Sequence, residues 1–316
     1  MNEKTSDSDN KSNTEQELVN RIAWEAISEQ RRARRWSIFF KLFFAGYFLL
    51  FLILLMPSDW DSGSIVGTKH TALIDINGVI SADSEASADY VVTGLRDAFE
   101  DRGTAGVILR INSPGGSPVQ AGYIYDEIKR LRGLHPDIPL YAVITDICAS
   151  GGYYIASAAD KIYANKASVV GSIGVIMSGF GFVDAIDKLG VERRLMHAGK
   201  NKGFLDPFTP LKPEEVKHVD KLLDNVYQQF IDVVKAGRGD RLKNDDKIFS
   251  GLVWTGEQSL DLGLVDALGS ASYVAREVIG AEDIVDYTRH ENVLDLFANK
   301  VGTSMANTLS SKFEMR

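Results

Sequence analysis

The chain has 316 residues, of which 45% are hydrophobic, so it is long enough to bury a substantial core. Its formal net charge of -8 argues against nucleic acid as the main partner, and its single cysteine excludes an intramolecular disulfide and a cysteine-rich metal site. That residue, Cys148, is expected to be a small buried side chain rather than a reactive thiol.

The first 35 residues are expected to form a cytoplasmic segment without a core of its own. Residues 1–17 are polar and charged and show no apolar period, which is typical of disorder. Residues 18–27 place apolar side chains at roughly helical spacing among charged ones, which indicates a short amphipathic helix. The basic run RRARR at 31–35 favours a cytoplasmic position for this end of the chain.

Residues 36–56 form an apolar run whose one charged residue is Lys41. As a helix, a run of this length spans about 30 Å of hydrocarbon, and Lys41 lies near enough to the basic end to reach the interface. A cleaved signal peptide is disfavoured because no small-x-small pattern follows the run. The sequence therefore predicts a single-pass transmembrane helix. In a bacterium, the rest of the chain would lie outside the inner membrane, in the periplasm or at the cell exterior.

A linker rich in Ser, Gly and Asp at 57–69 leads into a soluble domain at 70–290, which precedes a weakly amphipathic tail at 291–316. Near-continuously apolar strands alternate with helices through this domain, which predicts an α/β sheet with both faces covered. Strands are expected at 70–80, 104–114 and 139–147, two more within 160–177, and helices at 90–101, 119–134, 151–159 and 213–236.

Two glycine-rich turns follow neighbouring strands of the predicted sheet. The segment INSPGGSP contains Gly115 and Gly116, and the segment ASGG places Ser150 among small residues. Parallel strands present their C-terminal loops along one edge of a sheet, so both turns are expected to face one crevice. One turn would offer backbone N–H donors and the other a hydroxyl, which is what acyl transfer needs. Taken singly, the INSPGGSP turn is better explained as a plain strand-to-helix connection, and the residues around Ser150 do not decide between such a connection and a nucleophile.

The base that would activate Ser150 is not evident from spacing. No histidine lies between Ser150 and His197, and the five histidines form no evident pair with an acid. A lysine can accept the serine proton when its surroundings lower its pKa. Many lysines follow Ser150, among them Lys161, Lys166, Lys188, Lys200 and Lys202, and spacing alone does not choose among them.

Five segments, in order, resemble the signal peptide peptidase A (protease IV) family of membrane serine peptidases. They are INSPGG, ASGGYYIASAADKIYA, VGSIGVI, AGKNKGFLDPF and VWTGEQSLDLGLVDALG. The resemblance runs from about residue 72 to 285 and is to the short, single-domain form of the family. It implies a ClpP/crotonase-like fold of repeated ββα units and a serine-type endopeptidase with a Ser-Lys dyad. It implies no cofactor and no metal.

The resemblance assigns the nucleophile to Ser150 and the base to Lys202. Lys202 ends the segment GKNK, which is similar to the family pattern G-x-[YN]-K. Asn201 stands where the family more often has an aromatic residue, and Lys200 is the alternative base.

Supporting roles also follow from the resemblance. Ser172, in the segment GSIG, would hydrogen-bond the lysine and orient it. The oxyanion donors would be the N–H groups of Gly115 or Gly116, together with that of Gly151. In the family, the serine and lysine of one site come from neighbouring subunits of a ring. A homo-oligomer, an octamer, is therefore expected here.

The implied substrates are peptides, namely remnant signal peptides left in the membrane or other unfolded apolar segments. The alternatives are a SohB-type inner-membrane peptidase with other substrates, a crotonase-like enzyme acting on acyl-thioesters, and a non-enzymatic membrane scaffold. An active Ser150→Ala variant would favour the crotonase-like enzyme, whereas the presence of Ser150, Lys202 and Ser172 argues against the scaffold. Trp254 matches a family segment, but packing of a terminal strand-and-turn unit explains it equally well.

Overall fold

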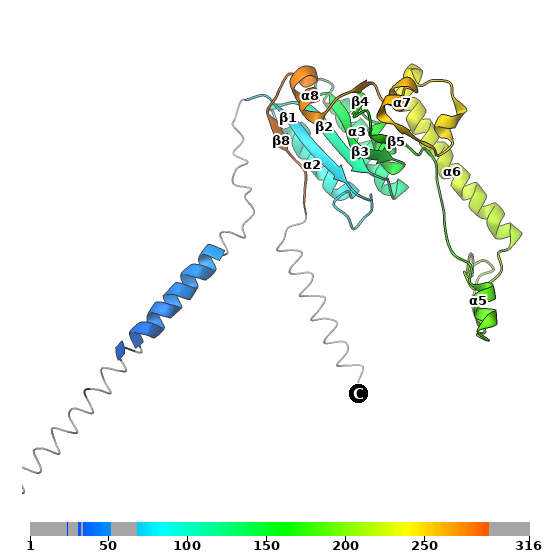
Figure 1. The fold of residues 1–316 in the computed structure, drawn as a ribbon, viewed down its shortest axis with the longest axis horizontal. Coiled ribbons are helices and arrows are strands. Elements are labelled where there is room, and N and C mark those ends of the chain that lie inside the picture. The colour runs from blue at the N-terminus through cyan, green and yellow to red at the C-terminus, as the bar shows by residue number, and fades with distance from the viewer. Residues whose placement is uncertain (1–23, 25–30, 33, 52–67, 291–316) are drawn as a thin grey trace, which may run out of the picture. The chain divides into compact units, whose positions relative to one another are not determined.

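The computed structural model describes residues 24, 31–32, 34–51 and 68–290 (Figure 1). The chain divides into two compact units, Met1–Ile65 and Val66–Arg316.

In the first unit, residues 34–51 are helical and their large apolar side chains are exposed. Among the described residues, no helix combines the length and the apolar character needed to cross a membrane. Residues 52–56, the end of the predicted transmembrane helix, lie outside the described residues. So do the predicted disordered segment 1–17, most of the predicted amphipathic helix at 18–27, residues 57–67 of the predicted linker and the whole of the predicted tail at 291–316. These elements stay predictions.

The second unit is built on a mixed eight-stranded sheet, which confirms the α/β class predicted from the sequence. The strands are β1 (His70–Asn77), β2 (Thr104–Ser113), β3 (Leu140–Ala149), β4 (Lys161–Ala164), β5 (Val169–Gly171), β6 (Val253–Thr255), β7 (Ala267–Leu268) and β8 (Ile284–Asp286). Their order is β6-β5-β3-β2-β1-β8, with β4 paired to both β3 and β7. The β5–β6 pair is antiparallel, and the other described pairs are parallel.

Strand β3 changes partner along its length. Residues 141–144 pair with β4, whereas residues 147–149 pair with β5. The register between β2 and β3 shifts at the same place, between Ile111 and Ser113. The C-terminal end of β3, which leads into Ser150, therefore lies between β2 and β5.

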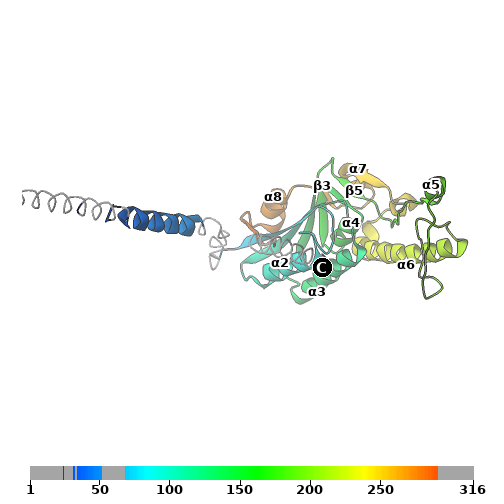
Figure 2. The same ribbon diagram turned by 90° about the horizontal axis from the view of Figure 1, so that it is seen from below.

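Helices cover both faces of the sheet, as Figure 2 shows. On one face lie α2 (Ala88–Glu100), α3 (Pro118–Leu134) and α4 (Gly151–Ala156), whose apolar side chains form the main core with every second residue of β1 to β3. On the other face, α8 (Ala271–Tyr273) and the helical turn Val274–Ile279 pack over a smaller set of strand residues. These residues include Leu73, Ile108 and Val143.

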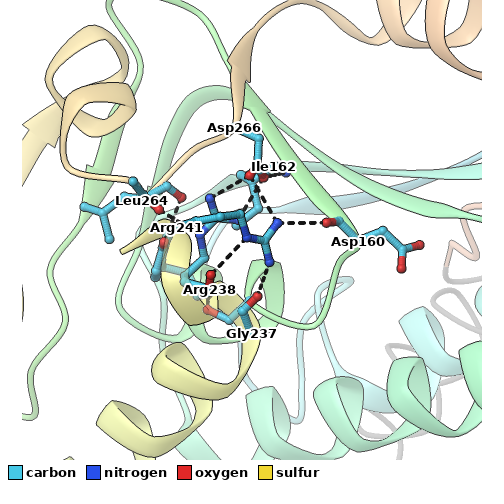
Figure 3. Close-up of polar contacts among 10 residues, drawn as sticks. Asp160, Ile162, Gly237, Arg238, Arg241, Leu264 and Asp266 are labelled. Atoms are coloured by element: carbon cyan, nitrogen blue, oxygen red, sulfur yellow. Dashed lines mark hydrogen bonds and ion pairs between the residues drawn. The ribbon is translucent and has the colours of Figure 1, made fainter. Parts of the chain in front are cut away.

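The long helix α6 (Pro213–Arg238) is anchored in the core at its C-terminal end, where Arg238 is 1% exposed. The Arg238 guanidinium donates to the carbonyl oxygen of Gly263 at 2.9 Å and to both carboxylate oxygens of Asp266 at 2.8 and 3.0 Å (Figure 3). Asp266 also accepts from Arg241 and from the Ile162 N–H. Burial alone would raise the pKa of Asp266, but these donors hold it below its ordinary value.

Residues 176–212, here called the arm, lead away from the sheet and include α5 (Val183–Lys188). Both views place α5 beside the outer end of α6, away from β3 and β5 (Figures 1 and 2). The arm packs on the first turns of α6, where the Leu205 N–H donates to Glu215 Oε2 at 3.4 Å and the Phe204 ring lies 5.7 Å from that of His218. Several large apolar side chains of the arm remain exposed, among them Ile176 (86%), Phe180 (82%) and Met196 (89%).

The predicted elements differ from the observed ones mainly in their ends. The helix expected at 151–159 is α4, which ends at Ala156 because the chain turns there to bring the Asp160 N–H to the Leu140 carbonyl. The two short strands expected within 160–177 are β4 and β5. Helices α5 and α7 (Gly256–Asp261) were not predicted, although Thr255 and Gln258 form a capping box at the start of α7.

Candidate active site

Ser150 occupies a strained turn between β3 and α4. Its backbone has φ 52° and ψ -123°, a conformation that non-glycine residues rarely adopt and that costs about 1–3 kcal/mol. The Ser150 N–H donates to the Gly171 carbonyl at 2.9 Å. Its hydroxyl makes no capping hydrogen bond to α4, although it stands at the N-cap position. The backbone of Ser150 is therefore fixed, while its half-buried hydroxyl is not used to cap the helix.

The glycine turn after β2 lies directly against Ser150. A Cβ placed on Gly115 would stand 2.7 Å from both the Ser150 Cβ and the Gly151 nitrogen. A Cβ on Gly116 would stand 2.1 Å from the Ile80 carbonyl oxygen, so no side chain fits there. The structure thus brings together the two glycine-rich turns that the sequence analysis singled out.

The two glycines of this turn differ in what their N–H groups do. The Gly115 N–H donates to Ser113 Oγ at 3.1 Å, and that hydroxyl donates to the Gly78 carbonyl at 2.6 Å. Among the described residues, the N–H groups of Gly116 and Gly151 find no acceptor within the fold. A Cβ on Gly151 would stand 3.3 Å from the Gly116 nitrogen, so these two donors lie close together. Gly116, rather than Gly115, therefore offers the free donor.

Ser113 is a residue of the site that sequence reasoning missed. It is fully buried, and its hydroxyl joins the Gly115 N–H to the Gly78 carbonyl by two hydrogen bonds that hold the glycine turn in place. The sequence signal was weak because a serine before Pro-Gly-Gly is ordinary in turns.

Ser172 directly follows β5, the strand that neighbours the end of β3 before Ser150. Strand β5 pairs with β3 in parallel, with Gly171 opposite Ala149, so Ser172 and Ser150 follow equivalent positions. Ser172 also has a positive φ of 50°, and its N–H donates to the Leu252 carbonyl at 2.7 Å. The structure therefore brings Ser150, Ser172 and the glycine turn to one edge of the sheet.

Lys202 lies in an exposed turn of the arm, as does the alternative base Lys200. The Lys202 N–H donates to the Gly199 carbonyl at 3.1 Å, and this turn leads to the contacts with the outer end of α6. The stretch of α6 from Glu215 to Phe230 rises about 22 Å before the Phe230 ring reaches Tyr154 of α4 at 5.3 Å. Among the described residues of one chain, no hydrogen bond joins either lysine to Ser150.

Cys148 and Tyr153, two other reactive side chains near the site, are buried in the fold. Cys148 is buried, as expected, and burial raises the pKa of its thiol. The Tyr153 hydroxyl is buried and donates to the Leu264 carbonyl at 2.8 Å. In the part of the chain that the structure describes, no three His, Cys, Asp or Glu side chains gather so as to hold a metal ion.

A groove of about 580 Å³ lies beside the chain that follows Ser172. Its lining combines apolar side chains with two acidic ones from α6 and consists of Gly174, Val175, Asp220, Leu223, Asp224, Tyr227, Phe249 and Ser250. A second groove, of about 610 Å³, lies between α2 and α3 and includes Arg96, Glu127 and Arg130. Neither groove is lined by Ser150 or Lys202; the first is close to the candidate site, since Gly174 is two residues from Ser172.

Comparison with known proteins gives a consistent family. Residues 133–283 match the family described as "Peptidase family S49". A protein of Enterococcus faecium named "Putative signal peptide peptidase SppA" is 32% identical over 209 residues, which cover 64% of this chain and 60% of that protein. A protein of Synechocystis named "Putative protease slr0021" is 35% identical over 202 residues, covering 64% of this chain and 70% of that protein.

A different name accompanies another similar sequence. A protein of Brucella melitensis named "Na(+)/H(+) antiporter NhaA" is 44% identical over 186 residues, which are 59% of this chain but 25% of that protein. This chain therefore spans a quarter of the length of the Brucella protein and 60% of the length of the Enterococcus protein. The antiporter name describes a protein of which three quarters are not matched here.

Proposed function

Because the chain belongs to peptidase family S49, the signal peptide peptidase A family that its motifs predict, we propose that it is a membrane-anchored serine endopeptidase with Ser150 as nucleophile and Lys202 as general base. The predicted family and its enzyme class, serine-type peptidases, are thereby confirmed. The observation that carries the proposal is the position of Ser150. It occupies a strained turn, with a hydroxyl not used in capping and two unused N–H donors beside it.

In the acylation step, the neutral amine of Lys202 accepts the Ser150 hydroxyl proton as Oγ attacks a peptide carbonyl carbon. The carbonyl oxygen becomes an oxyanion, and the N–H groups of Gly116 and Gly151 donate to it. The lysine ammonium then protonates the leaving amine as the C–N bond breaks, which leaves an acyl ester on Ser150. Water attacks that ester with Lys202 again as base and releases the carboxylate product. Because the amine must be neutral, the rate should rise on the alkaline side of neutrality.

We further propose that Lys202 comes from a second copy of the chain, in a homo-oligomeric ring of the kind that the family resemblance implies. Two observations support this arrangement. Among the described residues of one chain, no hydrogen bond joins Lys202 to Ser150, and the arm that carries the lysine exposes large apolar side chains such as Phe180 and Met196. Ser172, beside Ser150, is then positioned to hydrogen-bond the incoming amine and orient it.

The fold and the location belong to the same proposal. The change of partner along β3 supports a ClpP/crotonase-like arrangement of ββα units. The exposed apolar side chains of helical residues 34–51 support an anchor at 36–56 in a bacterial inner membrane, with the catalytic unit on its outer side. An anchored site of this kind suits remnant signal peptides or other unfolded apolar segments that emerge at the membrane surface.

The test is labelling of the detergent-solubilised full chain with a fluorophosphonate probe, followed by mass mapping of the adduct. The expected adduct is on Ser150. Lys202→Ala should lower its rate of formation by roughly 10³-fold, since general-base catalysis is worth about 10²–10⁴. Lys200→Ala is the matched control from the same turn and should stay within about threefold of the wild type.

An adduct on another residue, or no adduct in a preparation that cleaves peptides, would contradict the proposal. A loss of labelling with Lys200→Ala instead of Lys202→Ala would move the role of base to Lys200.

A further inference from the structure

The hairpin formed by β5 and β6 holds the backbone of both candidate serines. In this pair, Val170 lies opposite Trp254, and Gly171 lies opposite Val253. The Gly171 carbonyl accepts the Ser150 N–H at 2.9 Å. The carbonyl oxygen of Leu252, the residue before β6, accepts a hydrogen bond from the Ser172 N–H at 2.7 Å. A shift of the hairpin would therefore move Ser150 and Ser172 together.

The Trp254 side chain packs on the residue that links the two serines. A Cβ placed on Gly171 would stand 3.1 Å from Trp254 Cδ1 and 3.0 Å from the Leu252 carbonyl oxygen. Gly171 has a φ of 114°, a conformation that favours glycine, so both its backbone and its lack of a side chain are required here. The indole ring thus closes over the Gly171 backbone at the point where the Ser150 N–H is bound.

The indole nitrogen of Trp254 also lies at this contact, 3.7 Å from the same Cβ position on Gly171, but it forms no hydrogen bond there. Its indole N–H is buried and, among the described residues, has no hydrogen-bond partner. An unsatisfied buried donor costs free energy, so a tryptophan here is not explained by a hydrogen bond. What the side chain supplies is the flat apolar surface that packs against Gly171 and the edge of the main core.

We propose that Trp254 is a positioning residue for the reaction, which holds Gly171 and, through it, the strained backbone of Ser150 and the adjacent Ser172. This inference rests on the proposed function, since it takes Ser150 as the nucleophile. Without the indole, Gly171 gains room to move, and the strain at Ser150 can relax. The hydroxyl would then leave the geometry needed for attack, where an error of about 1 Å can cost 10²-fold in rate.

The experiment measures the rate of fluorophosphonate labelling of Ser150 in the full-length detergent-solubilised protein at a series of probe concentrations. The series gives two quantities, the maximal labelling rate and the probe concentration at which half of that rate is reached. Trp254→Ala should lower the maximal rate by roughly 10- to 100-fold and leave the half-maximal concentration within about threefold. Trp254→Phe, which keeps the flat ring and removes the unsatisfied N–H, should stay within about threefold in both. Trp254→Leu should fall between these two, and it replaces the alanine variant if that one does not fold.

Tyr273→Ala is the matched control, because Tyr273 also packs on a glycine but belongs to α8, the helix on the other face of the sheet. A Cβ on Gly269 would stand 2.7 Å from Tyr273 Cδ1. This variant should lower the melting temperature without a comparable loss in the labelling rate. Mass photometry of each variant checks that assembly is unchanged.

Three results would overturn the inference. They are a wild-type labelling rate in Trp254→Ala, an equal loss of rate in Tyr273→Ala, and a loss in Trp254→Phe as large as in Trp254→Ala. The last would show that the indole N–H is used. If the wild-type protein itself is not labelled at Ser150, the proposed function fails; if it is labelled and Trp254→Ala reacts equally fast, this inference alone fails.

Discussion

The sheet edge that carries Ser150 and the arm that carries Lys202 are held in opposite ways. Around Ser150, the backbone is fixed by the Gly171 carbonyl and crowded by Gly115, and it keeps a strained conformation. Lys202 lies in an exposed turn at the outer end of α6, on a segment whose apolar side chains remain uncovered. The first region is held by contacts within its own chain, whereas the second leaves large apolar side chains such as Phe180 and Met196 exposed.

This difference explains how one chain can contain the parts of a site without assembling them. Backbone strain persists where the surrounding structure over-determines it, and the sheet edge does so. Contiguous exposed apolar surface, in contrast, marks an interaction site. In the proposed ring, the arm of one chain places its Lys202 beside the Ser150 of a neighbouring chain. The strained backbone fixes the position of Ser150, and the exposed apolar surface of the arm fixes the position of the lysine.

The largest expected effect is at the nucleophile itself. Ser150→Ala and Ser150→Gly should both lower peptide cleavage by roughly 10⁴-fold or more, because the attacking oxygen is lost. Glycine adopts the positive φ of this position without strain, so Ser150→Gly should be more stable than Ser150→Ala by about 1 kcal/mol. Cleavage assays and chemical denaturation measure the two effects. An alanine variant more stable than the glycine variant would contradict the strain assigned to this turn.

The next effect concerns the glycine turn. In Gly116→Ala the new Cβ would meet the Ile80 carbonyl at 2.1 Å, so the turn must move away from Ser150. We expect a loss of labelling rate of about 10²-fold, as the oxyanion donor is displaced. Gly122→Ala, on α3 with nothing within 4 Å, should leave the rate unchanged and stabilise the protein by up to about 1 kcal/mol. Equal behaviour of the two variants would argue against a role for the turn.

A smaller effect on activity, but a large one on stability, is expected at the inner end of α6. Arg238→Met removes the buried partner of Asp266, whose side chain is 13% exposed, and breaking a buried pair costs about 3–5 kcal/mol. Arg241→Met is the control, because Arg241 binds the same carboxylate but is 40% exposed and should cost less than about 1 kcal/mol. Thermal denaturation distinguishes them. Similar melting temperatures would mean that this network does not anchor the helix that supports the arm.

The smallest effect lies far from both regions, between α2 and α3. The hydrogen bond from Arg130, with support from Arg96, outweighs burial and lowers the pKa of Glu127 to about 2. Because this folded-state pKa is below the ordinary glutamate value of 4.5, the stabilisation is complete above about pH 4.5 and is lost as the pH falls toward 2. Both arginines are half exposed, so the contribution is about 1 kcal/mol.

The check on this pair is the difference in unfolding free energy between the wild type and Glu127→Gln, measured at several pH values. The difference should shrink as the pH drops from about 5 to 2, and neutral-pH labelling of Ser150 should be the same in both proteins. A difference that does not depend on pH would contradict the assigned pKa.

Much of the fold could be predicted because its long elements have clear periods. Apolar strands and amphipathic helices mark β1, β2, β3, α2, α3 and α6, and the structure moves their ends by a few residues. The short helices α5 and α7 were missed because six residues show little period, although the capping box of Thr255 and Gln258 marks the start of α7.

The site was predictable in part, for a similar reason. That Ser150 and the glycine turn meet follows from the geometry of parallel strands, which carry their C-terminal loops to one edge. The roles of Ser113 and Gly171 could not be inferred, because a hydrogen bond to a backbone carbonyl leaves no mark on the sequence. The spacing of the lysines also did not identify Lys202 as the base, since a base on a projecting arm can serve a site in another copy of the chain.

Mixed assembly tests whether the Ser150 and Lys202 of one site come from two different chains. Ser150→Ala and Lys202→Ala chains, each inactive alone, are co-assembled in equal amounts, and mixed assemblies are verified by native mass spectrometry. In a head-to-tail ring with sites shared between neighbours, random mixing pairs an intact serine with an intact lysine at about a quarter of the sites. A site shared between chains therefore predicts that about a quarter of wild-type peptidase activity returns. No recovery in verified mixed assemblies would contradict it and would require Ser150 and Lys202 to act within one chain.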